Sequence, residues 1–439
     1  MALGGGTFVT QNKVLPGTYH NFVSASRAFL NLSDRGYVAF PTVASWGPET
    51  VVQVTAEDFQ KNSLVLFGYD YTHEKLKPLR DIFKGATTVF VRRLALTGAT
   101  AATNDFATAK YKGVRGNQLS IVITKNVDDT DNFDVFTLLD GVEVDVQRNV
   151  ESAADLKANE FVTFKPSATL AVTAGTALAT GSDGTGADTG TPHQAALEDL
   201  EMYGFNVLVC ASANATVKSL YMEYTKRMRN EVGAKFQVVV HKADKPDHEG
   251  IINVQNDAEG AESQGMVYWV SGASAGVNVN ASNTNRLYDG EFVPSMAETN
   301  TQTKLVTLIE AGKFAFHRVG EDIRVLRDIN SFTSFTVDKN EDFSANQVIR
   351  VIDQIAIDTA NIFNTRYLGK VPNDADGRIS LWNDILTHRL ELQRLRAIQD
   401  YDSKKLTIAQ GNAKNSVVAN EEVNVTWAME KLYITTVVA

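Results

Sequence analysis

A serine between small residues is the pattern in this chain that most invites a catalytic interpretation. Gly272-Ala-Ser274-Ala-Gly276 follows the apolar run 266–270 and matches the G-x-S-x-G turn that exposes a nucleophilic serine in α/β-hydrolases. That turn has to lead into a helix, but residues 277–283 are mostly Asn and Val and do not predict one. We therefore expect a close-packed turn here, and we retain a soluble α/β serine hydrolase that uses Ser274 as the alternative function.

A carboxylate and a histidine near residue 190 suggest a protease fragment. The string Asp188-Thr-Gly190, followed by His193, is similar to strings found in aspartic and serine proteases. An aspartic protease needs a second carboxylate loop of this kind, and the sequence holds none. Thr191 and Pro192 also suit the start of a helix, which would place His193 in its first turn. We therefore interpret the stretch as a loop that ends in a helix cap.

Two histidines and two aspartates lie close together in the middle of the chain. His241, Asp244, Asp247 and His248 are residue types that bind metals, but Pro246 and the adjacent lysines favour a solvated loop. The sequence also contains no P-loop, no G-x-G-x-x-G helix start and no H-E-x-x-H motif. We therefore expect no catalytic residue, no metal and no cofactor, and we do not expect an enzyme.

Composition excludes further classes of protein. A chain of 439 residues is long enough for several domains, and 44% hydrophobic residues are typical of a globular protein. Because 52 acidic residues outnumber 42 basic ones, nothing in the overall charge favours nucleic acid or an anionic membrane as a partner. A single cysteine, Cys210, excludes an internal disulfide, and no apolar run is long enough to span a bilayer. We expect a soluble protein in a reducing, intracellular setting.

Strand and helix patterns alternate in two stretches of the chain. The first has an apolar strand, a helix and a second apolar strand, over 37–40, 72–84 and 88–91. In the second, helices with predicted caps at Thr191 and Thr216 each lead into an apolar strand. Continuously apolar strands are typical of a buried parallel sheet. We therefore predict an α/β core with a mostly parallel sheet and right-handed crossovers.

A β module interrupts this core. Its four predicted strands are short and separated by Asn, Asp and Gly, and they span 119–123, 133–136, 142–146 and 161–164. In the third strand valines alternate with acids, as in a strand with one exposed face. Residues 166–190 are almost entirely Ala, Thr, Gly, Ser and Asp and have too little to bury, so they predict a linker or surface loop.

Two long helices are predicted in the last hundred residues. Ser344 to Gln347 form a capping box for the first, which should end near Gly369. The second spans about 379–398 and places basic residues among its outer positions, including Arg389, Arg394 and Arg396. We expect these to be solvated or to dock an acidic partner.

Both ends of the chain are apolar and prone to form strands. The apolar side chains in question are Phe8, Val9, Val14, Tyr19, Phe22 and Val23 at one end and Val425, Trp427, Leu432, Tyr433, Ile434, Val437 and Val438 at the other. Free apolar strands are an aggregation hazard, so we expect these arms to pair with neighbouring subunits. One arm alone is marginal because ordering costs ~1–2 kcal/mol per residue. Two arms that reach different neighbours would give a head-to-tail polymer of stacked rings.

Several loose motifs in a fixed order carry a family resemblance. They are Gln11–Phe22, Ser33–Gly36, Pro41, Ser45–Pro48, Gly272–Gly276, Asn283–Thr284, Asp328–Thr333 and Met429–Tyr433. With a β insertion between two α/β halves, this order resembles the tail sheath proteins of contractile-tailed bacteriophages and related phage-tail-like particles, especially those of Gram-positive hosts. The resemblance covers nearly the whole chain.

The resemblance implies a fold and a structural function. The fold would be a subtilisin-like, non-catalytic α/β core with a mostly parallel sheet, an inserted all-β sandwich, and an α+β C-terminal domain whose sheet accepts extended arms from adjacent subunits. Hexameric rings would stack around an inner tail tube and contract to drive it through the target cell envelope. The chain would belong to a virion tail or a phage-tail-like particle assembled in the host bacterial cytoplasm.

These expectations divide the chain into seven parts. They are an N-terminal arm (1–25), the first part of the core (26–104), the sandwich (105–165), a linker (166–190), the second part of the core (191–340), the C-terminal domain (341–422) and a C-terminal arm (423–439). The implied partners are further copies of the chain, a tail tube protein, and baseplate and tail terminator proteins, without nucleic acid or membrane contact. Arg389, Arg394 and Arg396 would face the tube. Another kind of self-assembling shell protein remains an alternative.

Overall fold

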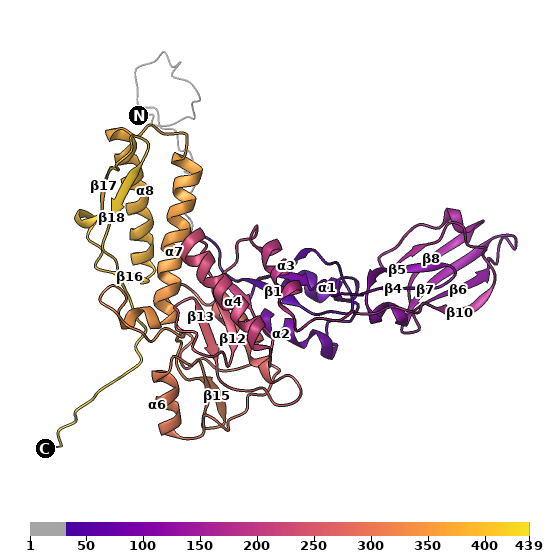
Figure 1. Cartoon of the computed structure of the whole chain (residues 1–439), viewed down its shortest axis with the longest axis horizontal. Coiled ribbons are helices and arrows are strands. Elements are labelled where there is room, and N and C mark those ends of the chain that lie inside the picture. Colours follow the sequence, from indigo (N-terminus) through magenta and orange to yellow (C-terminus); the bar gives the residue numbers. More distant parts are fainter. Residues whose placement is uncertain (1–31, 439) are drawn as a thin grey trace, which may run out of the picture.

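The computed structural model describes residues 32–438, and these form an elongated molecule in three parts. A β-sandwich lies at one end, an α/β core in the middle, and a layer built on two long helices at the other end (Figure 1). The predicted N-terminal arm, with Phe8, Val9, Val14, Tyr19, Phe22 and Val23, lies outside the described residues.

A six-stranded sheet forms the centre of the core, in the order β13-β12-β11-β1-β3-β2. Its strands are β1 (Tyr37–Thr42), β2 (Val51–Thr55), β3 (Thr88–Arg93), β11 (Val207–Val209), β12 (Gln237–His241) and β13 (Ile251–Val254). All neighbours pair in parallel except β2, which lies antiparallel to β3 at one edge. The predicted parallel sheet is confirmed. The sequence prediction missed β2, the helix α1 (Ala56–Phe67) that follows it, and β13.

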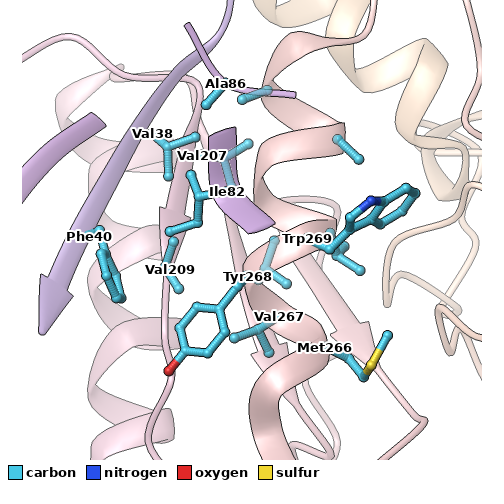
Figure 2. Packing of buried hydrophobic residues seen from close by; sticks show 14 of the residues in the cluster. Val38, Phe40, Ile82, Ala86, Val207, Val209, Met266, Val267, Tyr268 and Trp269 are labelled. Carbon is cyan, nitrogen blue, oxygen red and sulfur yellow. The ribbon is translucent and has the colours of Figure 1, made fainter. Parts of the chain in front are cut away.

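Helices cover both faces of this sheet. One face packs against α1, α2 (Lys77–Phe83) and α5 (Met266–Gly276), and the other against α3 (Gly190–Leu200) and α4 (Ala215–Arg227). Along β1, Val38 and Phe40 face the first cluster and Ala39 faces the second, as the alternation of a strand requires. Figure 2 shows Phe40 near Tyr268 of α5, and the two rings meet edge to face.

The segment expected to be a close-packed turn is a helix, α5, and that expectation is wrong. Ten of its eleven residues are buried, so it lacks the polar face by which sequence patterns reveal a helix. Gly272 and Gly276 lie one turn apart where α5 crosses α2. A Cβ at Gly272 would lie 2.0 Å from the Ile82 carbonyl oxygen, and one at Gly276 would lie 1.8 Å from that of Gly85. The glycines are therefore there for helix packing.

The predicted helix caps at Thr191 and Thr216 are each displaced by two residues. Thr189, not Thr191, precedes α3, and its side chain makes no capping bond. Asn214, not Thr216, caps α4 by accepting hydrogen bonds from the amides of Thr216 and Val217. Asn214 accepts well because its short side chain reaches the second and third helical amides.

The β-sandwich contains all four predicted strands and three more. One sheet holds β4 (Ala101–Thr103), β5 (Ala107–Lys112) and β9 (Val162–Phe164), and the other holds β6 (Leu119–Lys125), β7 (Phe133–Leu139), β8 (Val142–Val150) and β10 (Thr173–Ala177). Because β10 pairs with β6 and Leu178 beside it is buried, the prediction of a linker over 166–190 is wrong. Small residues suffice there because β6 and β7 supply the apolar side chains.

A third part follows the core. It is built on the helices α7 (Asn346–Ile362) and α8 (Ala375–Arg394). The preceding helix α6 (Gln302–Glu310) and hairpin β14 (Phe316–Val319) and β15 (Asp322–Val325) still belong to the core, because Phe316 and Val325 lie in its apolar cluster. Two small sheets pair β16 (Ile398–Gln399) with β19 (Asn424–Val425), and β17 (Thr407–Gln410) with β18 (Val417–Asn420). Ala345 rather than Ser344 precedes α7, so the predicted capping box is also wrong. Within residues 32–438, no helix combines the length and apolar character that a membrane crossing requires.

Replacing Gly276 by Ala should destabilise the subunit. The new methyl group would collide with the Gly85 carbonyl oxygen, and overpacking of this kind costs about 1–3 kcal/mol. Denaturant unfolding of the full chain measures the loss. Gly204→Ala is the matched control, because nothing lies within 4 Å of the Cβ it would add. Equal stability of the two variants would contradict the close crossing of α5 over α2.

Candidate functional site

Ser274 lies in the last turn of α5 and is not placed to serve as a nucleophile in this structure. Its side chain is 1% exposed, and its hydroxyl oxygen is buried without a hydrogen-bond partner. A nucleophile elbow exposes the serine at a strained strand-to-helix turn and holds it beside a base. Neither condition is met, so the geometry does not support the alternative of a serine hydrolase.

His193 ties two helices together. Its Nδ1 lies 2.8 Å from the Tyr221 hydroxyl of α4, and its Nε2 lies 2.9 Å from the carbonyl oxygen of Ala187. Burial lowers the pKa of His193, which suits a neutral ring in this position. His193 therefore helps to pack α3 against α4. Neither of its ring nitrogens is hydrogen-bonded to Asp188, so the two residues do not form a catalytic pair.

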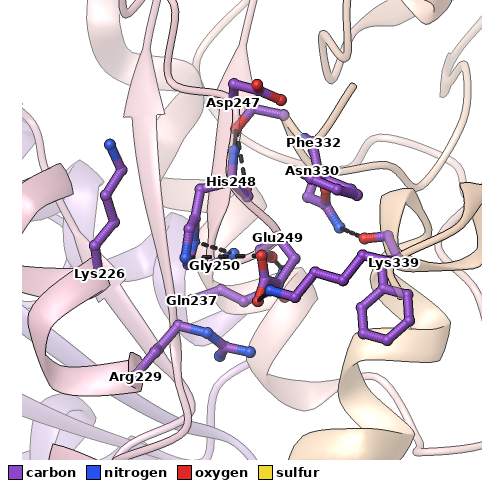
Figure 3. Close-up of polar contacts among 12 residues, drawn as sticks. Lys226, Arg229, Gln237, Asp247, His248, Glu249, Gly250, Asn330, Phe332 and Lys339 are labelled. Carbon is purple, nitrogen blue, oxygen red and sulfur yellow. Dashed lines mark hydrogen bonds and ion pairs between the residues drawn. The ribbon is translucent and has the colours of Figure 1, made fainter. Parts of the chain in front are cut away.

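The candidate metal ligands point to different partners (Figure 3). Asp247 accepts hydrogen bonds from the amides of Thr333 and Ser334, and His248 Nδ1 accepts one from the amide of Gly250. His241 lies 3.1 Å from Asp257 instead.

Burial lowers the pKa of His248 to about 4, so this ring is neutral near neutral pH. Asp244 is exposed. Among the residues that the structure describes, no group of three or more His, Cys, Asp or Glu side chains is arranged to hold a metal.

The C-terminal segment is docked on its own chain as far as Glu430. Val425 lies in β19 and pairs with β16, and the amide of Ala428 donates to Gln347 Oε1 at 3.0 Å. The Glu430 carboxylate accepts hydrogen bonds from Arg327 Nε at 2.8 Å and from the Thr284 hydroxyl at 2.8 Å. Val425 and Trp427, predicted to belong to an intersubunit arm, thus form the root of that arm on their own subunit.

Beyond Glu430 the chain leaves the molecule. The apolar side chains of this tail are 74–91% exposed, and they are Leu432, Tyr433, Ile434, Val437 and Val438. The tail projects away from every folded part of the molecule (Figure 1). The apolar side chains of such a segment become buried only if the segment binds to the surface of another molecule.

The hairpin β17–β18 presents open strand edges on the same part of the molecule. Its inner face packs on α8, where Ile408 and Val417 join a cluster with Leu381 and Trp382. Within residues 32–438, neither outer edge pairs with a further strand. Unpaired amides and carbonyls along such an edge can accept another strand by backbone hydrogen bonds.

Only two of the three basic residues expected to face a partner are on the surface. Arg389 is 1% exposed and bonds Glu421 at 2.7 Å, so its predicted outer position is wrong. It lies beside His388 on the face of α8 that is turned toward α7. Arg394 and Arg396 are exposed, and Arg394 pairs with Glu391.

Four family models together match almost the whole described chain. They are the phage tail sheath protein domains described as Gp18 domain III N-terminal region (residues 35–94), β-sandwich domain (97–183), central domain (186–331) and C-terminal domain (338–439). The match to the central domain ends at residue 331, before α7 begins at Asn346. The matched regions therefore correspond to the sandwich, the two segments of the core and the C-terminal part of the structure.

Individual proteins agree with these models. The phage-like element PBSX protein XkdK of Bacillus subtilis (strain 168) is 32% identical over 98% of this chain and 99% of its own. The crystal structure of a sheath tail protein from Desulfitobacterium hafniense is 32% identical, covers 93% of this chain and 100% of its own, and has a TM-score of 0.79.

A more distant structure shares the fold alone. The helical sheath of the anti-feeding prophage, solved in the contracted state, is 10% identical over 97% of this chain and 99% of its own, with a TM-score of 0.59. The match of all three parts of the described chain to tail sheath domains indicates a structural role. The chain belongs to the phage tail sheath protein family.

Proposed function

We propose that the subunits assemble into stacked hexameric rings that are linked by strand exchange through their two chain ends. The observation that carries this proposal is the tail 431–438, which is apolar, extended and exposed while its root is firmly docked. The predicted N-terminal arm would make the second link.

The energetics favour an arm that is fixed at its root. Each apolar side chain of the tail gains about 1.5–3 kcal/mol when fully buried, and each backbone bond to a neighbour adds about 0.5–1.5 kcal/mol net. Ordering costs about 1–2 kcal/mol per residue and nearly cancels these gains for one free strand. Because Glu430 is already held by Arg327 and Thr284, the tail starts from a defined point. Two such links per subunit then act together.

The acceptor in this proposal is the hairpin β17–β18 of a neighbouring subunit. Its inner face is supported by α8, and Trp382 Nε1 donates to the Leu406 carbonyl oxygen at 2.8 Å, directly before β17. A hairpin supported in this way holds its exposed edges in place for the addition of a strand.

The remaining partners follow from the same assignment. We infer that the rings surround a tail tube, that exposed Arg394 and Arg396 face it, and that the sheath ends on baseplate and tail terminator proteins. Contraction would drive the tube through the target cell envelope. The particle is a virion tail or a phage-tail-like particle assembled in the host bacterial cytoplasm.

Deleting residues 431–439 should abolish tube formation and leave the subunit folded. The deletion removes the exposed apolar side chains but keeps the contacts of Glu430, Ala428 and Val425. Negative-stain electron microscopy of the purified protein measures assembly, and thermal unfolding checks the fold. Lys431→Ser, which changes the tail without removing apolar surface, is the control. Normal tubes from the shortened chain would contradict the role of the tail.

Ile434→Pro should weaken assembly far more than Ile434→Val. Both variants keep an apolar side chain, but proline removes a backbone donor and breaks a strand ladder. Because Ile434 is 74% exposed, neither change should alter unfolding of the isolated subunit. Sedimentation of assembled tubes compares the two. Equal assembly would show that the tail binds by side-chain burial without joining a sheet.

A further inference from the structure

The segment that follows the predicted N-terminal arm and the root of the C-terminal tail converge on the same pair of helices. Leu32 is the first residue that the structure describes. It packs against an apolar cluster that includes Val351 of α7 and Leu392 of α8. Val423 and Val425, at the root of the C-terminal tail, pack against the same cluster. The helices α7 and α8 lie side by side (Figure 1).

A set of buried polar contacts begins at the N-terminal root. The Ser33 amide donates to Asp358 Oδ1 at 3.0 Å, and the Ser33 hydroxyl donates to the same oxygen. Gln354 of α7 donates to Asp358 Oδ2 at 2.9 Å and to the Ser33 carbonyl oxygen at 3.1 Å. Burial would raise the pKa of Asp358, but hydrogen bonds from His388, Ser33 and Gln354 outweigh it and hold the pKa below its usual value.

The contacts continue through α8 to the C-terminal root. His388 Nε2 lies 2.8 Å from Asp358 Oδ2, and Arg389 Nη1 lies 2.6 Å from His388 Nδ1. Arg389 then binds the Glu421 carboxylate through Nη2 at 2.7 Å and Nε at 2.9 Å. Glu421 follows β18 and lies three residues before β19, the strand at the root of the tail.

The donor and acceptor roles along this series are fixed. A guanidinium can only donate, so Nδ1 of His388 must accept and the proton of the neutral ring must lie on Nε2. That proton is donated to Asp358, which in turn accepts from Ser33. The side chains of Asp358, His388 and Arg389 are no more than 4% exposed, so water cannot replace a lost partner.

We propose that Asp358, His388 and Arg389 form a buried relay that couples the positions of the two chain ends within one subunit. A shift of Glu421 moves Arg389, which leaves His388 without its donor and loosens the hold of Asp358 on Ser33. The consequence for a sheath rests on the proposed role of the arms: load on one arm would reach the other through α7 and α8 without crossing the α/β core.

Amide hydrogen exchange of the full chain tests the coupling from the C-terminal side. Glu421→Gln should raise exchange at the Ser33 amide by at least about twofold, the change that matches the lower bound of ~0.5 kcal/mol for coupled residues. Glu422→Gln is the matched control, because its side chain is 71% exposed and pairs with Lys405 on the surface. It should leave Ser33 unchanged.

The reverse variant tests the same coupling from the other end. Ser33→Ala should raise exchange at the Thr426 amide, which donates to the Ala397 carbonyl oxygen at 3.0 Å, and exposed Asp34→Asn should not. Amides of α5 report that the core stays folded. Effects confined to the mutated end in both variants would overturn the relay. Because the readout is made on the subunit, this outcome is distinct from a failure to form tubes.

Discussion

Buried ion pairs between α7 and the α/β core set the position of everything that follows the core. Arg229, in the π-helical turn after α4, binds both oxygens of Asp353 at 2.7 and 2.8 Å. Arg350 bonds Asp328 at 2.7 Å, and Asp328 also accepts from Asn346 at the start of α7. Burial would lower the pKa of Arg229, but Asp353 outweighs it and the net shift is upward.

Such pairs specify geometry more than they add stability. Removing two charges from water costs nearly as much as their attraction returns, but removing one partner leaves a buried charge at a cost of about 3–5 kcal/mol. The first half of α7 therefore has one permitted position on the core. The second half of α7 carries Asp358 and the contact with α8. Because the roots of both chain ends pack on α7 and α8, their positions depend on how α7 is fixed to the core.

Four of the six core strands and four of the seven sandwich strands could be predicted, because apolar runs and period-two alternation depend only on local burial. The helix α5 could not be predicted, since a helix buried on all sides has no periodic polar face. The sequence shows the two glycines of Gly272–Gly276, but it does not show why glycine is needed there. The reason is the close approach of the Ile82 and Gly85 backbone, which is distant in sequence. The strand β10 was missed because its burial is provided by β6.

The same limit applies to the candidate site. The free tail could be predicted because it is apolar and terminal, which are properties of the sequence itself. The burial of Arg389 could not, because charged residues are assigned to helix exteriors unless their partners are known. Its partner Glu421 is 32 residues away, in the segment between β18 and β19, and the sequence alone does not show that the two meet.

The contrast between a tightly packed core and an exposed C-terminal tail affects how such a subunit could move in a polymer. Close helix crossing in the core and ion pairs at α7 oppose internal rearrangement, since each has little tolerance for displacement. A strand ladder made by the tail would depend on backbone groups that repeat every two residues and tolerate twist. Rotation between subunits is then easier than distortion within one, so the proposed links would bend at the stretch between Glu430 and the ladder while their anchors stay fixed.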